Sequence, residues 1–180
     1  MPRALACLCL LLLLWPSTAA RATDVGIAAF QGVWQGNAIS ESEVSTNFRL
    51  TSRDIDVTVR TDTGGGFAIV WNTVQRQKGD PNNPREKLKS TEMQFAPVRQ
   101  SVWRATANGD PLNSAAPFAW AFVKDHTLHI VSLQIYADGQ HESQTYRRSL
   151  SGTGMALEYI RNVDGEQVRR ASGRLIKVAN

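Results

Sequence analysis

Hydrophobic and polar residues alternate along most of this chain with a period of two. In DIDVTVR (54–60), apolar side chains at 55, 57 and 59 alternate with polar ones at 54, 56, 58 and 60. This pattern is typical of a β-strand that buries one face and exposes the other. About ten such runs follow one another from Val33 onward.

Turn signals separate these runs. The strongest are Asp138-Gly139, Asp164-Gly165 and the triple glycine at 64–66, which favour tight hairpins. The only helical signal is a short turn around 28–31. A flat meander of about ten strands would leave two edge strands with unpaired backbone groups, which tend to aggregate. The sequence therefore predicts an all-β fold, a single up-and-down antiparallel β-barrel of about 8–10 strands. A two-sheet β-sandwich is the alternative, because turn spacing does not separate the two.

The first 22 residues differ from the rest of the chain. Arg3 precedes an apolar run at 5–15, and small residues then lead to Ala22. This is the pattern of a secretory signal peptide. We expect a signal peptide at 1–22, cleaved near Ala22, and a single β-barrel domain at 23–180 in the periplasm or secreted. The apolar run is too short for a membrane-spanning helix, and no later stretch is long enough.

Cysteine content and charge narrow the chemistry. Both cysteines, Cys7 and Cys9, lie in the predicted signal peptide, so the remaining domain has no disulfide and no thiolate. Removing 22 of the 180 residues leaves 158, with 18 basic and 16 acidic side chains because Arg3 and Arg21 are lost. No run of lysine or arginine indicates a nucleic-acid partner. The three histidines lack metal-ligand spacing, so no metal site is expected.

The run FQGVWQG (30–36) resembles the Gly-x-Trp opening of calycin-type barrels, the lipocalins and fatty-acid-binding proteins. The resemblance implies that Trp34 plugs one end of the barrel. It also implies that an arginine late in the chain packs over this ring, as a cation–π contact. Arg174 is the candidate for that structural role, and Arg161 is the second choice. The flanking glycines then allow neighbouring backbone to come close.

The same opening is similar to that of nitrobindin-type haem barrels, which need a histidine to ligate iron. His129 shares a face with Val131, Leu133 and Ile135, so it is the histidine expected to point inward. A single inward histidine is more often a hydrogen-bonded core residue. We therefore expect no cofactor, and haem held through His129 is the remaining alternative.

Aromatic residues mark the predicted interior. Phe118, Trp120 and Phe122 share one face of a run, and Trp71 shares a face with Phe67 and Ile69. A barrel of this size holds either a packed core or one small ligand. In the second case an Arg–Tyr pair, for example Arg147 or Arg60 with Tyr159, would hold a carboxylate by charge-assisted hydrogen bonds. The candidate ligand-binding residues are Trp71, Trp120, Phe122, Tyr146, Arg147 and Tyr159.

These features favour an exported, lipocalin-like barrel that binds a small hydrophobic or amphipathic molecule. The long loops at 75–90 and 106–117 fall at one mouth and would gate access. No catalytic residue is assigned. The alternatives are a small barrel enzyme of the isomerase or cyclase type, with an inward acid of perturbed pKa, and an envelope structural or protein-interaction domain. An outer-membrane barrel fits the exterior poorly, because polar residues alternate at 54–60.

Overall fold

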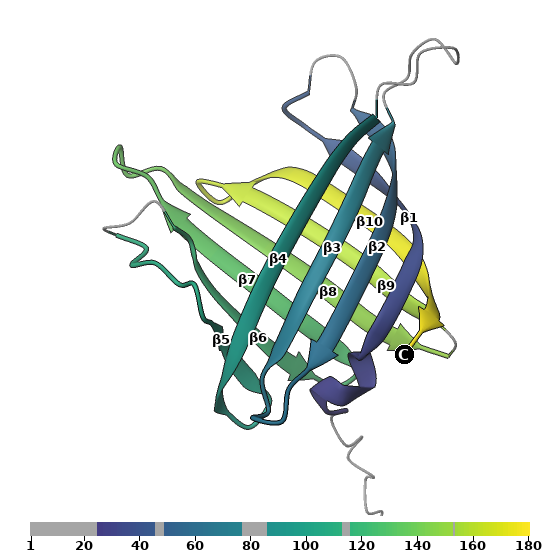
Figure 1. Cartoon of the computed structure of the whole chain (residues 1–180). Helices are drawn as coiled ribbons and strands as arrows, with labels where there is room; N and C mark the ends of the chain where they lie inside the picture. The colour runs from purple at the N-terminus through teal and green to yellow at the C-terminus, as the bar shows by residue number, and fades with distance from the viewer. Residues whose placement is uncertain (1–24, 46–48, 77–85, 113–115, 153) are drawn as a thin grey trace, which may run out of the picture.

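The computed structural model describes residues 25–45, 49–76, 86–112, 116–152 and 154–180. The predicted signal peptide at 1–22 and most of the predicted loop at 75–90 lie outside these ranges. One 3-10 helix and ten strands are present (Figure 1): η1 (Ile27–Phe30), β1 (Gly32–Ser42), β2 (Leu50–Thr61), β3 (Phe67–Arg76), β4 (Glu86–Arg99), β5 (Val102–Ala105), β6 (Phe118–Lys124), β7 (Thr127–Ile135), β8 (His141–Ser151), β9 (Gly154–Val163) and β10 (Glu166–Ala179). Among the described residues, no helix is long and apolar enough to cross a membrane.

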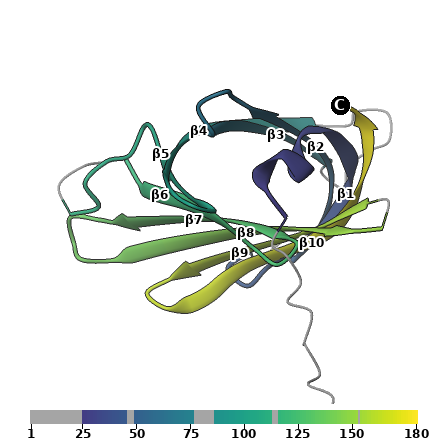
Figure 2. The same cartoon turned by 90° about the horizontal axis from the view of Figure 1, so that it is seen from below.

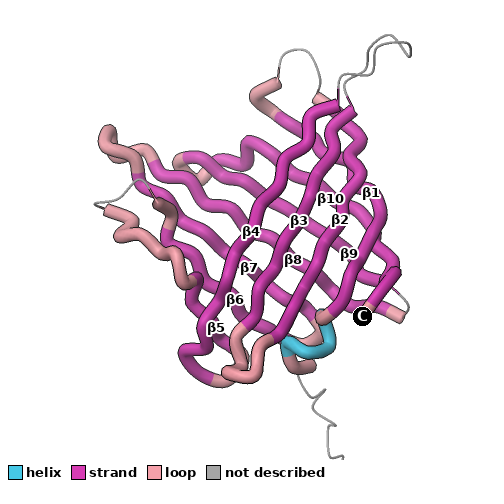
Figure 3. The backbone as a smooth tube through the Cα atoms, viewed as in Figure 1, coloured by secondary structure: helices cyan, strands magenta, loops and turns pink. Residues whose placement is uncertain are grey.

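The ten strands form one closed antiparallel barrel. Each strand pairs with its neighbours in sequence, and β1 closes the ring by pairing with β10, where Ala38 faces Gly173. The up-and-down course of the chain is visible in the backbone trace (Figure 3). The predicted barrel is thus confirmed over the sandwich, as is the short turn near residue 28, which is η1.

One end of the barrel is closed by η1, which lies across it (Figures 1 and 2). Phe30 at the end of η1 is fully buried, and Trp34 is 4% exposed. The indole Nε1 of Trp34 donates a hydrogen bond of 2.9 Å to the Phe30 carbonyl oxygen. The tryptophan of the Gly-x-Trp pattern therefore packs where η1 covers the barrel.

The cation above Trp34 is not the expected one. Lys177 Nζ lies 5.6 Å from the centre of the ring, and both Lys177 and Arg174 are exposed to solvent. On β10 the residues buried in the barrel are Ala171 and Leu175, and side chains alternate along a strand. Arg174 consequently faces outward, and Lys177 lies on the inner side. Arg161 contacts Glu142 instead.

Aromatic rings fill the interior near this closed end. The rings of Phe67 and Phe95 stack with centres 4.8 Å apart, and Trp103 meets Phe67 edge-on at 5.5 Å. Trp103 Nε1 donates to the Gly65 carbonyl oxygen at 2.7 Å, in the β2–β3 hairpin. The part of the barrel beside η1 is therefore solidly packed.

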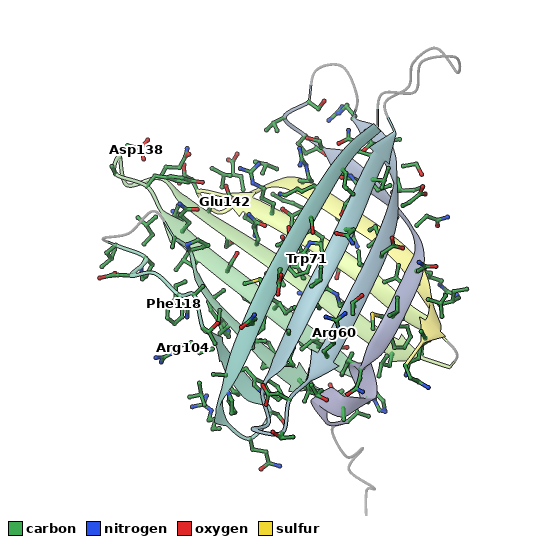
Figure 4. The ribbon with its side chains drawn as sticks, viewed as in Figure 1. Arg60, Trp71, Arg104, Phe118, Asp138 and Glu142 are labelled. Atoms are coloured by element: carbon green, nitrogen blue, oxygen red, sulfur yellow. The ribbon has the colours of Figure 1, made fainter. Side chains whose placement is uncertain are left out.

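The aromatic row of β6 faces outward, contrary to the expectation that it lines the interior. Ala119, Ala121 and Val123 are the buried residues of β6. Ala121 lies beside Trp103 in the β5–β6 register, so a small inward side chain leaves room for the large ring. Figure 4 shows Phe118 on the outer surface beside Arg104, whose guanidinium carbon lies 5.9 Å from the Phe118 ring centre.

Close packing of β1 on β10 gives the first test. A Cβ added at Gly36 would collide with the backbone of Arg174, whereas one added at Gly26 meets nothing within 4 Å. We expect Gly36→Ala to lower the free energy of unfolding by about 1–3 kcal/mol, the usual cost of overpacking. Gly26→Ala is the control and should change it by less than about 0.5 kcal/mol. Urea denaturation measures both, and equal effects would contradict the close β1–β10 contact.

Candidate functional site

A small polar chamber lies within the barrel, away from the packed end. Its volume is about 110 Å³, and the residues around it come from β2, β3, β4, β8, β9 and β10. Four of them are cationic, and among the described residues that line it there is no carboxylate. The lining residues are Arg53, Ile55, Trp71, Thr73, Lys89, Tyr146, Arg148, Leu157, Tyr159, Arg169 and Ala171.

Arg148 is the most unusual of these side chains, because its guanidinium is buried and no carboxylate is found among the described residues that line the chamber. It is 1% exposed, and its Nε and Nη1 have no hydrogen-bond acceptor among the described residues. Its guanidinium carbon lies 5.0 Å from the ring centre of Trp71 and 5.7 Å from that of Tyr146. Burial lowers the pKa of Arg148 to about 10, so the group still carries its charge at neutral pH.

Two further arginines add to this positive charge. Arg53 on β2 and Arg169 on β10 each have a buried Nε without an acceptor in the described part of the chain. Burial, followed by repulsion from Arg169, lowers the pKa of Arg53. Repulsion of this kind and unmet donors are both unfavourable in a low-dielectric interior. The chamber therefore presents buried hydrogen-bond donors and uncompensated positive charge together.

Glu142, whose charge acts on both Tyr146 and Tyr159, is already engaged. Arg161 Nη2 donates to Glu142 Oε2 at 2.6 Å, and Gln144 Nε2 donates to Oε1 at 2.6 Å. The hydrogen bond from Arg161 is the main reason that the pKa of Glu142 lies below its usual value. Glu142 therefore neutralises Arg161, and the described residues that line the chamber supply no carboxylate to its arginines.

Gln144 also orients the two tyrosines of the chamber. Its Oε1 accepts hydrogen bonds from the Tyr146 hydroxyl at 2.7 Å and from the Tyr159 hydroxyl at 3.3 Å. Burial raises the pKa of both hydroxyls. Tyr146 and Tyr159 thus stay protonated and donate hydrogen bonds, rather than exchanging protons near neutral pH.

A second, larger cavity joins the chamber to the surface. It has a volume of about 700 Å³ and shares Trp71, Lys89 and Tyr146 with the chamber. Much of its wall is apolar, including Met93 and Ala119. Its size lies within the range of ordinary small-molecule sites. The lining residues also include Thr91, Glu92, Gln94, Ala105, Thr106, Ala107, Asn108, Pro117, Ser132 and Gln144.

This cavity reaches the surface past the edge of β4. Both inward Met93 and outward Glu92 line it, so it extends around the strand. The strand β5 pairs with β4 only from Phe95 onward, which leaves the earlier part of that edge without a strand partner there. Beyond β5, the side chain of Asn108 bonds the Ala119 backbone in place of a strand, donating at 3.0 Å and accepting at 2.6 Å.

The predicted ligand-binding residues divide into two groups. Trp71, Tyr146 and Tyr159 line the chamber. Trp120 and Phe122 lie on the outer face of β6, opposite the buried alanines. Neither of these two rings lines a cavity described above.

Arg147 and Arg60 also face outward, which corrects the predicted Arg–Tyr pair. Arg147 Nη1 donates to Glu158 at 2.8 Å on the exposed surface, and Arg60 is exposed. The arginines in the chamber are Arg148, Arg53 and Arg169. Side chains two positions apart on a strand share a face. Arg148 therefore shares the inner face of its strand with Tyr146, and Arg53 shares the inner face of its strand with Ile55. Arg169 shares the inner face of its strand with Ala171 in the same way.

His129 points outward as well, so the expectation that it faces the interior is wrong. The residues of β7 that are buried are Leu128 and Ile130. The His129 ring stacks on Phe122 with centres 4.4 Å apart. Burial, followed by the charge of Arg147, lowers its pKa. The haem alternative thereby loses the interior ligand on which it rested. Within the described ranges, no group of three or more His, Cys, Asp or Glu residues could hold a metal ion.

Fold and site together define a closed ten-stranded antiparallel β-barrel with a cationic internal chamber. No family model matches the chain, and no curated protein matches it. Among solved structures, it is similar to the S-type phycobiliprotein lyase CPES from Guillardia theta. The two chains are 9% identical, the match covers 87% of this chain and 94% of that one, and the TM-score is 0.38. A likeness this distant carries no argument about the site.

The buried charge of Arg148 predicts an effect on stability. Replacing it by methionine, as Arg148→Met, keeps the apolar stem and removes donors that have no acceptor. We expect the ligand-free protein to gain about 1–3 kcal/mol in the free energy of unfolding, the cost of such an unsatisfied group. Arg147→Met, on the exposed side of the same strand, should change it by less than about 1 kcal/mol. Denaturant unfolding of refolded protein measures both, and a large loss in Arg148→Met would show that the charge is compensated.

Proposed function

We propose that this protein binds a small amphipathic anion inside its barrel. The anionic headgroup lies in the chamber with Arg53, Arg148 and Arg169, and the apolar part lies in the larger cavity beside Trp71 and Met93. The observation that carries the proposal is Arg148, a buried guanidinium with two donor atoms that no described residue satisfies.

Charge supports an anion over a neutral or cationic ligand. Four cations line the chamber, and an anion there would accept their hydrogen bonds and offset their mutual repulsion. Arginine is well suited to this role, because its planar fork binds carboxylate or phosphate oxygens in pairs. Tyr146 and Tyr159 remain protonated and already donate their hydroxyl protons to Gln144, so they add no negative charge to the chamber.

The larger cavity supports an amphipathic ligand over a simple inorganic ion. It shares three side chains with the chamber, so one molecule is able to occupy both. Its apolar walls stabilise a hydrocarbon or ring portion by removing that portion from water. We propose that the ligand passes the edge of β4, beside residues 106–108 of the predicted gating loop at 106–117.

Export of the protein is a part of this proposal that rests on sequence alone. The segment at 1–22 has the charge, apolar core and small residues of a signal peptide. A cysteine-free domain at 23–180 would then bind its ligand in the periplasm or outside the cell.

Binding of decanoate tests the proposed function. We expect purified domain to bind decanoate and to bind decan-1-ol, its uncharged analogue, much more weakly. Arg148→Met should lower the affinity for decanoate by about 30-fold or more. Removing one partner of a buried charged pair costs about 2 kcal/mol or more, and 1.4 kcal/mol is a factor of ten. Isothermal titration calorimetry measures each affinity.

The neighbouring substitution Arg147→Met is the matched control and should leave the affinity for decanoate unchanged. Quenching of tryptophan fluorescence, in which Trp71 should take part, gives an independent reading of the same titration. Equal affinity for decanoate and decan-1-ol, with no effect of Arg148→Met, would contradict an anion site in the chamber.

The route past β4 has its own kinetic test. Ala107 is exposed and lines the larger cavity, so Ala107→Trp places a large ring at its surface opening. We expect the association rate of decanoate to fall by about tenfold, while stability changes by less than about 0.5 kcal/mol. Ser172→Trp, at an exposed position on β10, is the control. Stopped-flow fluorescence measures the rates, and equal rates in both variants would place the route elsewhere.

A further inference from the structure

We infer that the chamber selects a doubly charged tetrahedral headgroup, such as a phosphate monoester, over a singly charged one. This inference rests on the proposed function and narrows the class of ligand. It follows from the number of cations around the chamber, from the donors they leave unmet, and from the chamber's size.

The charge around the chamber exceeds what a single negative charge offsets. Lys89, Arg53, Arg148 and Arg169 line it, and among the described lining residues no acid opposes them. Glu142 is hydrogen-bonded to Arg161. Arg148 is buried and Arg53 and Arg169 are partly buried, whereas Lys89 is exposed. A monoanion would leave two of the three arginine charges uncompensated where water screens them only in part. A dianion offsets one charge more.

The hydrogen-bond donors that lack acceptors also favour a phosphate monoester as the ligand headgroup. Arg148 contributes Nε and Nη1, and Arg53 and Arg169 each contribute a buried Nε. A carboxylate has two acceptor oxygens, whereas a phosphate monoester has three strong acceptor oxygens. Three arginines arriving from β2, β8 and β10 approach from separate strands, which suits oxygens arranged around a tetrahedral centre better than oxygens in one plane.

The size of the chamber fits a headgroup of this kind. Its volume is about 110 Å³, the space of roughly three to four water molecules at about 30 Å³ each. A tetrahedral oxyanion fits such a space, and a longer apolar portion does not. The apolar portion would extend past Trp71 and Tyr146 into the larger cavity, which those two residues also line.

Decyl phosphate and decyl sulfate separate charge from shape. Both headgroups are tetrahedral, but at pH 8 the phosphate carries about two negative charges and the sulfate carries one. We expect decyl phosphate to bind about tenfold or more tightly at pH 8, the effect of one further charge-assisted hydrogen bond. The affinity for decyl phosphate should fall by up to about tenfold between pH 8 and pH 5, because its second pKa is about 6. The affinity for decyl sulfate should stay constant.

The protein groups around the chamber do not produce such a change themselves. Burial leaves the pKa of Arg148 at about 10 and raises the pKa of Tyr146 and of Tyr159, so none of these three groups changes its charge between pH 5 and pH 8. The pKa of Glu142 lies below its usual value because of Arg161. His129 lies outside the barrel, stacked on Phe122. A pH dependence seen only with the phosphate ligand therefore reports the charge of the ligand.

Substitutions then assign the selectivity to the arginines. Arg53→Met and Arg169→Met should each reduce the ratio of phosphate to sulfate affinity towards one, while Arg147→Met keeps the ratio of the wild-type protein. Equal affinities of wild-type protein for the two ligands at pH 8, with decanoate still bound, would overturn the dianion inference and leave the proposed function intact. Failure to bind decanoate, decyl sulfate and decyl phosphate would overturn both. Because the ligand pair is compared on wild-type protein, the test holds even where a variant fails to fold.

Discussion

The structure depends on one unusual interaction, the burial of the Arg148 guanidinium beside the rings of Trp71 and Tyr146, where two of its donor atoms have no acceptor among the described residues. A charge removed from water is costly, and attraction to the faces of Trp71 and Tyr146 offsets only part of that cost. The barrel tolerates it because the opposite end is packed with stacked rings and covered by η1. The aromatic packing that stabilises the barrel therefore lies at one end, and the buried hydrogen-bond donors without acceptors lie away from it.

The polar network beside the chamber explains how this arrangement stays specific. Glu142 holds Arg161, and Gln144 holds the hydroxyls of Tyr146 and Tyr159. These contacts fix the ring of Tyr146, over which Arg148 lies. The carboxylate of Glu142 is paired with Arg161 and not with Arg148. The protein therefore orients its cations while keeping a counter-charge away from them, which is the property that an anion site requires.

The all-β meander and the inward direction of several strands followed from alternation, whereas the choice of a closed barrel over a sandwich was confirmed by the structure. The strand at 54–60 buries its apolar residues as the pattern predicted, and Trp71, Tyr146 and Tyr159 line the chamber. The prediction of the inward face from alternation was wrong where both faces of a run were apolar. In β6 either the alanines or the aromatic rings could have faced inward, and the bulk of Trp103 on the neighbouring strand decided for the alanines. His129 in β7 was misplaced for the same reason, since Leu128 and Ile130 competed for the interior.

The sequence by itself determined the fold class, because a period of two in hydrophobicity is a local property that needs no knowledge of neighbours. It also determined that residues 10–180 form no disulfide, since both cysteines, Cys7 and Cys9, precede them. Only the tertiary structure decided which charges meet. Arg53, Arg148 and Arg169 lie far apart along the chain and converge when β1 pairs with β10 and closes the ring. These three arginines share one chamber, where some of their hydrogen-bond donors are buried without acceptors among the described residues, only once the barrel has closed.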